Sequence, residues 1–167
     1  MNQYFTLFQL EPQFDIDAAA FEQTYRSLAA RFHPDKFAAA SAFEQKQAMM
    51  MASTLNEAYR TLKSPIDRAA YLLKQQGIDA DAPEHTSFAP EFLIQQMEWR
   101  EALEDARAAS NETALLKLAG SITAEQQQLQ TELASAFEKA QYETAATLVR
   151  QGRFLNKLQQ EIQAALP

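Results

Sequence analysis

The tripeptide His33-Pro34-Asp35 places an imidazole and a carboxylate close together, between two stretches that both have helical periodicity. These side chains can bind a metal ion or make charge-assisted hydrogen bonds to a partner. As a metal site the pair is incomplete, because it offers two ligands and the only other histidine, His85, lies far along the chain. In a simpler interpretation, Pro34 ends one helix and Asp35 caps the next. The surrounding elements decide among these alternatives.

The composition argues against several classes of site and partner. The 167 residues include no cysteine, which excludes disulfides, thiolate zinc sites and directly thiolate-bound iron–sulfur clusters. We find no glycine-rich phosphate loop, no nucleophile elbow and no cluster of histidines and carboxylates, so we expect neither an enzyme nor a protein with a metal or other cofactor. The net charge of −7 argues against nucleic acid as the main partner.

The sequence also lacks the signals of a membrane or exported protein. No apolar run approaches the roughly 20 residues that a membrane span needs. No Lys or Arg precedes Arg26, so we recognise neither a signal peptide nor a transit peptide and expect a bacterial cytoplasmic protein without a membrane partner. Charge is uneven along the chain, because the whole net charge of −7 falls in residues 77–167. Two halves with different surfaces indicate two functions.

Two long helices are predicted on either side of the tripeptide. The first covers residues 18–32, with Asp15 or Asp17 as its N-cap, and the second covers residues 41–63. We expect the inward side of the second helix to consist of Phe43, Met50, Leu55, Ala58, Tyr59 and Leu62. With short helices before and after them, this antiparallel pair forms a compact all-α unit over residues 1–76.

A short linker and a second helical unit follow. Pro65 begins a short helix that ends at Gly77, and residues 77–90 contain two prolines but no helical period, which predicts a linker. Residues 91–167 then form a bundle of three antiparallel helices, predicted to cover about 89–108, 111–138 and 140–165. The expected fold is therefore all-α in both halves.

The first half resembles the J domain of DnaJ-type co-chaperones. The resemblance rests on the tripeptide, on Tyr25 and Leu28 before it, and on the stretch "LNEAYRTLKSPIDRAAYLL" after it. It implies that the loop triggers ATP hydrolysis on a DnaK-type chaperone. The residues implied in that contact are His33, Pro34, Asp35 and Lys36, together with Arg26 and Arg31. Residues 21–32 carry fewer basic residues than typical J domains do, which indicates a specialised chaperone partner.

The predicted helix over 91–106 has two apolar faces, although packing in the bundle needs only one. Four residues at core spacing form the first face, Phe92, Trp99, Leu103 and Ala106. On the opposite side lie Leu93, Ile94 and Met97, flanked by acidic residues. Such an apolar surplus with an acidic rim favours a binding surface. The alternative is that the linker or the first unit covers it.

The whole chain resembles the HscB family of J-type co-chaperones, which serve iron–sulfur cluster assembly. The stretches "HPDKF", "RAAYLL", "FLIQQMEWREALE" and "RFLNKL" occur here in the order typical of that family. The resemblance implies that the bundle binds the scaffold protein IscU and delivers it to the DnaK-type chaperone HscA. The implied scaffold-binding residues are Leu93, Ile94, Met97, Glu101, Asp105 and Phe154. The alternative function is a J-domain adaptor that brings a different client to a DnaK-type chaperone.

Overall fold

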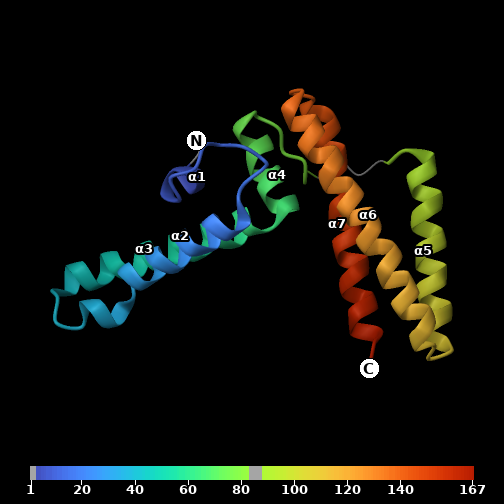
Figure 1. The fold of residues 1–167 in the computed structure, drawn as a ribbon, viewed down its shortest axis with the longest axis horizontal. Coiled ribbons are helices and arrows are strands. Elements are labelled where there is room, and N and C mark those ends of the chain that lie inside the picture. The colour runs from blue at the N-terminus through green and yellow to red at the C-terminus, as the bar shows by residue number, and fades with distance from the viewer. Residues whose placement is uncertain (1–2, 83–87) are drawn as a thin grey trace. The chain divides into compact units, whose positions relative to one another are not determined.

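The computed structural model describes residues 3–82 and 88–167, and every element of regular secondary structure in these ranges is a helix. The chain divides into two compact units, Met1–Gln76 and Gly77–Pro167 (Figure 1). The predicted all-α fold is confirmed. Within the predicted linker 77–90, residues 83–87 lie outside the described residues.

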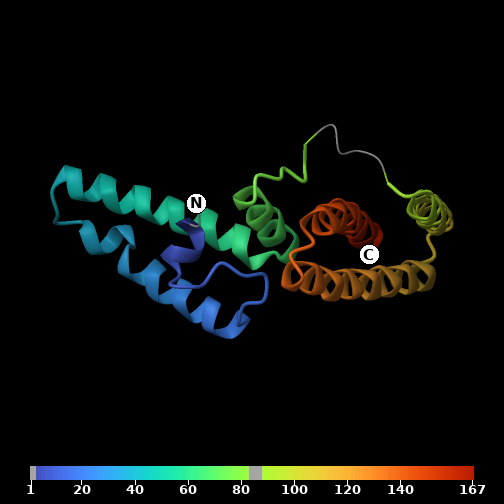
Figure 2. The ribbon, with the colours of Figure 1, turned by 90° about the horizontal axis from the view of Figure 1, so that it is seen from above.

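In the first unit, two long helices form an antiparallel hairpin whose closed end carries a short 3₁₀ helix (Figure 2). The elements are α1 (Gln3–Leu7), α2 (Ala18–Arg31), the 3₁₀ helix η1 (Pro34–Phe37), α3 (Ala42–Lys63) and α4 (Pro65–Gln75). The helix boundaries follow local capping signals. The Asp17 carboxylate accepts a hydrogen bond from the Ala20 N–H at 3.1 Å, and the Ser41 hydroxyl accepts one from the Glu44 N–H at 3.2 Å. Gly77, with a φ of +78°, follows α4 as predicted.

Aromatic rings and their hydroxyl groups hold α2 against α3. The ring of Tyr59 stacks on Tyr25 at 3.8 Å between centroids and on Phe21 at 5.5 Å. The Tyr25 hydroxyl donates to the Asn56 carbonyl oxygen at 2.9 Å, and the Tyr59 hydroxyl donates to the Glu22 carboxylate at 2.5 Å. Because each tyrosine both packs and hydrogen-bonds across the hairpin, the two helices are fixed in register as well as in spacing.

A buried arginine on α4 ties the open end of the hairpin together. Arg68 donates from Nε to the Phe14 carbonyl at 2.6 Å and from Nη1 to the Leu62 carbonyl at 2.7 Å. Its guanidinium also lies 4.9 Å from the centroid of the Phe14 ring. Burial lowers the pKa of Arg68, and the Asp15 carboxylate opposes that shift. The two carbonyls thus have a charged donor, which fixes the segment before α2 to the end of α3.

One prediction for the inward side of α3 is wrong. Leu55, Ala58 and Leu62 are buried as expected, but Phe43 is 69% exposed and Met50 is 61% exposed. On a helix with about 100° per residue, Phe43 lies about 120° and Met50 about 140° around the helix from Leu55. They share an apolar character with the core residues but belong to a different face of the helix.

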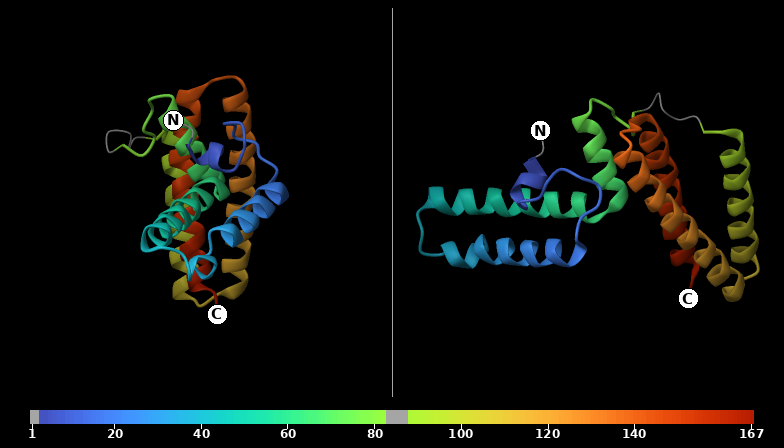
Figure 3. Two further views of the ribbon diagram at one scale, coloured as in Figure 1. Left: turned by 90° about the vertical axis from the view of Figure 1, so that its left-hand side faces the viewer. Right: turned by 45° about the horizontal axis from the view of Figure 1, so that its top comes forward.

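In the second unit, α6 and α7 pack along their length, and α5 lies beside α6 (Figure 3). The bounds are α5 (Pro90–Ala108), α6 (Glu112–Glu138) and α7 (Tyr142–Ala165), close to the predicted ranges. The α6 stripe contributes Leu115, Leu118, Ile122, Leu129 and Leu133 to the core, and α7 contributes Leu148, Leu155, Leu158 and Ile162. Apolar residues at helical spacing on both partners therefore build the seam that the sequence pattern predicts.

Both turns of the bundle use a left-handed residue that is not glycine. Ser110 follows α5 with a φ of 48°, and Ala140 follows α6 with a φ of 54°. The next N–H group in each turn reaches back to the preceding helix, from Asn111 to the Ala106 carbonyl at 2.9 Å and from Gln141 to the Ala136 carbonyl at 2.8 Å. These hydrogen bonds satisfy carbonyls at the helix ends and offset the strain of the left-handed residue.

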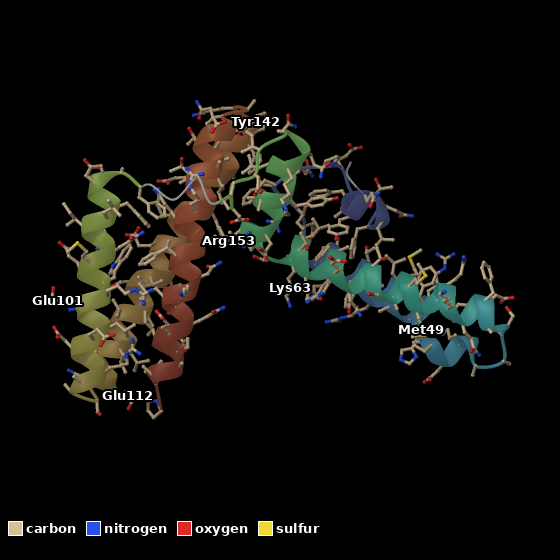
Figure 4. All side chains as sticks on the ribbon, turned by 180° about the vertical axis from the view of Figure 1, so that it is seen from behind. Met49, Lys63, Glu101, Glu112, Tyr142 and Arg153 are labelled. Atoms are coloured by element: carbon tan, nitrogen blue, oxygen red, sulfur yellow. The ribbon has the colours of Figure 1, made fainter. Side chains whose placement is uncertain are left out.

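The segment that enters the second unit is pinned to α7. Arg153 donates from Nε and from Nη2 to the two carboxylate oxygens of Asp81, each at 3.0 Å, and the neighbouring Ala80 is buried. Figure 4 labels Arg153 on α7. Such a bidentate pair fixes the orientation of the two side chains as well as the distance between them, so residues 77–82 pack with the bundle. Among the described helices, none has the length and hydropathy needed to cross a bilayer.

Candidate functional site

The His-Pro-Asp loop is an ordered, exposed turn. Its backbone continues directly from the end of α2, and η1 begins at Pro34, whose ring suits the first position of a helix. His33 Nδ1 accepts a hydrogen bond from the Asp35 N–H at 3.2 Å, so in this turn the imidazole itself is the N-cap. An accepting Nδ1 leaves the proton of a neutral imidazole on Nε2, the outer nitrogen of the ring. The exposed loop therefore offers one ring donor and the Asp35 carboxylate to a partner.

A glutamine on α3, which the sequence analysis did not identify, positions the loop. Gln45 Nε2 lies 3.0 Å from the Phe37 carbonyl, 3.2 Å from the Ala38 carbonyl and 3.4 Å from the Ala40 carbonyl. These contacts join the chain after the tripeptide to the first turns of α3. A lone glutamine in a helix has no distinctive sequence signal, because its role depends on which carbonyls the fold brings within reach.

The predicted basic residues are exposed but do not form one stripe. Lys36 lies in η1 itself, next to the loop carboxylate. Arg31 ends α2, and its guanidinium lies 5.8 Å from the centroid of the Phe32 ring. Arg26 is five residues earlier, about 140° away around the helix at about 100° per residue. The structure thus places Lys36 and Arg31 beside the loop and Arg26 farther along α2, on the other side of its exposed face.

On α5, five of the six predicted scaffold-binding residues share one exposed face. Met97 is 71% exposed, Ile94 58% and Leu93 45%. Glu101 and Asp105 are exposed on the following turns, and Figure 4 labels Glu101 on the side of α5 away from α7. Within the second unit, none of the described residues covers this face. Its exposure within this unit favours a binding surface.

The opposite face of α5 packs inward, and the sixth predicted residue lies there. Trp99, Leu103 and Ala106 are buried, while Phe92 is half-buried. The half-buried Phe154 ring lies 5.8 Å from the Phe92 ring and 6.3 Å from the Trp99 ring, measured between centroids. Phe154 thus contributes to the aromatic contact between α7 and α5.

A charged pair reinforces this contact between α5 and α7. Arg100 forms an ion pair with Glu161, and its guanidinium lies 5.4 Å from the centroid of the Phe154 ring. The pair holds α5 against α7 while the other side of α5 stays open. In the described residues we find no group of three or more histidines and carboxylates that could hold a metal ion. The geometry of both regions suits recognition of partners.

Comparison with known proteins shows similarity to the HscB family. The model of the HSCB C-terminal oligomerisation domain matches residues 88–163. A co-chaperone protein HscB homolog from Neisseria meningitidis is 67% identical over 166 residues, which cover 99% of this chain and 100% of that protein. A homolog with the same description from Bordetella avium is 44% identical over 99% of this chain and 98% of its own length.

Solved structures show the same similarity. Chaperone HscB from Vibrio cholerae has a TM-score of 0.85 and 39% sequence identity, and the match covers 98% of this chain and 96% of that one. The human co-chaperone protein HscB has a TM-score of 0.88 and 31% identity, over 96% of this chain and 80% of that one. The similarity includes both helical units.

Proposed function

The chain belongs to the HscB family of co-chaperones, and from this premise we propose that it acts in iron–sulfur cluster assembly. In this role it stimulates ATP hydrolysis by a DnaK-type chaperone of the HscA type and delivers the scaffold protein IscU to it. Hydrolysis takes place on the chaperone, so this chain is not itself an enzyme and uses no cofactor. We place the protein in the bacterial cytoplasm.

One observation carries the proposal: a single chain presents an ordered His-Pro-Asp loop on one unit and an exposed apolar face with an acidic rim on the other. The loop suits the role of trigger, because its proline and its hydrogen bonds to His33 and Gln45 remove conformational freedom before binding. Little entropy is then lost on docking, and the exposed polar groups of His33 and Asp35 can distinguish between two states of the ATPase.

The α5 face suits the role of scaffold-binding surface. Leu93, Ile94 and Met97 supply apolar area that water otherwise covers, and Glu101 and Asp105 at its edge select for a partner with basic residues. The loop and the face lie in one chain. A scaffold bound to the face is therefore held at a high local concentration near the chaperone on which the loop triggers ATP hydrolysis. Coupling of this kind favours the ADP state that holds the scaffold tightly.

Single-turnover ATP hydrolysis by an HscA-type chaperone tests this proposal. The rate is measured with this protein alone, with IscU alone and with both together. We expect stimulation by both together to exceed the sum of the separate effects. Absence of stimulation by this protein would contradict the trigger function. Stimulation that IscU does not enhance would retain the trigger and favour an adaptor for a different client.

A further inference from the structure

Met97 is the most exposed of the large apolar side chains in the second unit, and it lies at the centre of the α5 face. Its neighbours one turn away on the same face are Leu93, Ile94 and Glu101. The sequence from residue 77 to residue 167 contains no cysteine and no other methionine. The single sulfur atom of this unit therefore lies in the surface that we assign to scaffold binding.

We propose that Met97 is a site of reversible oxidation and that its sulfoxide weakens scaffold binding. This inference rests on the function proposed above. The oxidant is a peroxide: a sulfur lone pair attacks one peroxide oxygen, an S–O bond forms and the O–O bond breaks. The second oxygen leaves as water after it takes up a proton. Sulfur is oxidised by two electrons and the peroxide is reduced by two.

The structure explains why an added oxygen matters at this position. A sulfoxide oxygen is a strong hydrogen-bond acceptor, and it keeps its water only while the face is exposed. When a partner covers the face, the oxygen needs a donor from nearby. Leu93 and Ile94 offer none, and Glu101 is a carboxylate. Arg100, three residues on, already pairs with Glu161 and lies over the Phe154 ring.

The expected loss follows from the lack of a free donor on this face, because the basic groups that we infer on the partner pair with Glu101 and Asp105 at its edge. A buried acceptor without a hydrogen bond weakens an interface by about tenfold or more. Oxidation thus converts the most adaptable apolar contact of the face into a polar group that opposes docking. Because methionine sulfoxide reductases reverse the change, the effect can be undone without new protein synthesis.

The methionines of α3 provide an internal control for this chemistry. Met49 is 64% exposed and Met50 is 61% exposed, while Met51 is half-buried, and all three lie in the first unit. Peroxide reaches Met49 and Met50 as readily as Met97, so their sulfoxides form in the same treatment. They lie outside the scaffold-binding face, and we expect their oxidation to leave scaffold affinity unchanged.

The experiment treats full-length protein with hydrogen peroxide and measures the affinity for IscU before treatment, after treatment and after repair by the reductases. The proteins are the wild type, M97L and the triple variant M49L/M50L/M51L, each compared with its own untreated affinity. Peptide mass analysis records the extent of oxidation at each methionine. We expect the wild type and the triple variant to lose affinity about tenfold and to regain it on repair, whereas M97L stays at its starting value.

A separate M97Q variant, which carries a permanent amide at this position, should bind IscU more weakly than the wild type without any treatment.

Three outcomes would overturn the inference. One is full oxidation of Met97 with no loss of affinity, and another is an equal loss in M97L. The third is IscU that binds but does not protect Met97 from peroxide, which would show that the scaffold uses another face. By contrast, untreated wild type that does not bind IscU at all would contradict the proposed function itself, and this inference with it.

Discussion

Under the proposed function, the His-Pro-Asp loop and the α5 face would recognise their partners by different physical means. The loop is polar, and its backbone geometry depends on specific hydrogen bonds, from the Asp35 N–H to His33 and from Gln45 to three carbonyls. The α5 face is a regular helix surface whose backbone would be the same with any helix-forming residues. Its specificity lies in the side chains of Leu93, Ile94 and Met97. Binding through a polar loop of this kind can be lost when a single hydrogen-bonding atom is removed. Binding through an apolar face weakens in proportion to the apolar area that is removed.

The largest effect is expected at His33. Replacement by Gln keeps a polar side chain but removes the imidazole and its Nδ1 acceptor, so the contact with the ATPase and the internal cap are both lost. We expect His33→Gln to abolish stimulation of the HscA-type ATPase in single-turnover assays, while the α5 face still binds IscU. Normal stimulation by this variant would remove the loop from the mechanism.

Truncation of the α5 face should lower the affinity for IscU and leave the stimulation of the ATPase by the loop unchanged. The double variant Leu93→Ala/Met97→Ala truncates two exposed apolar side chains. The core is not disturbed, because neither side chain packs inward. We expect the affinity for IscU to fall by about 30- to 700-fold, which corresponds to roughly 2–4 kcal/mol for two central interface residues. Titration calorimetry measures this change, and stimulation without the scaffold serves as the control. An unchanged affinity would mean that the scaffold binds elsewhere.

A smaller effect on the trigger is expected from Gln45→Ala. The substitution leaves the loop residues intact but removes the amide that lies within reach of three loop carbonyls. Since the carbonyls are exposed, water replaces the amide, and the cost is about 1–2 kcal/mol of loop ordering. Stimulation should fall by roughly 5- to 30-fold at limiting co-chaperone concentration. Gln47→Ala, at an exposed position on the same helix, is the matched control and should behave as wild type. Equal rates for the two variants would refute a positioning function for Gln45.

The smallest effect concerns the stability of the bundle alone. Ala140 has a φ of 54°, which is strained for alanine and natural for glycine. Ala140→Gly should therefore raise the free energy of unfolding by about 0.5 kcal/mol, after the higher entropy of the unfolded glycine is subtracted. Ala124→Gly, in the interior of α6, should instead lower it by about 1 kcal/mol. Urea unfolding measures both, and a lower midpoint for Ala140→Gly would contradict the role of strain at this turn.

Where sequence reasoning succeeded, the deciding interactions were local. Asp17 caps the helix that begins one residue later, the second long helix begins within one residue of the predicted start, and Gly77 follows α4 with a positive φ. Each of these signals acts within a few residues, so the sequence contains it entirely. The α6 stripe was predictable for the same reason, because a long helix with one apolar face has a single way to bury it.

Where it failed or fell short, the deciding contact was distant along the chain. Phe43 and Met50 have the composition of core residues, but α2 packs against a different side of α3. Phe154 lies near the edge of its apolar stripe in the sequence, and only the positions of Phe92 and Trp99 show how its ring is used. Gln45 carried no signal at all.

The sequence by itself thus determined the helices, their caps and the two partner-facing elements, because propensity, periodicity and short motifs act over one or two turns. The tertiary structure alone decided that Phe43 and Met50 stay exposed, which amide holds the loop and that Arg100 near Met97 is already paired. Those properties depend on side chains brought together from helices separated by tens of residues, and no local pattern encodes their distances.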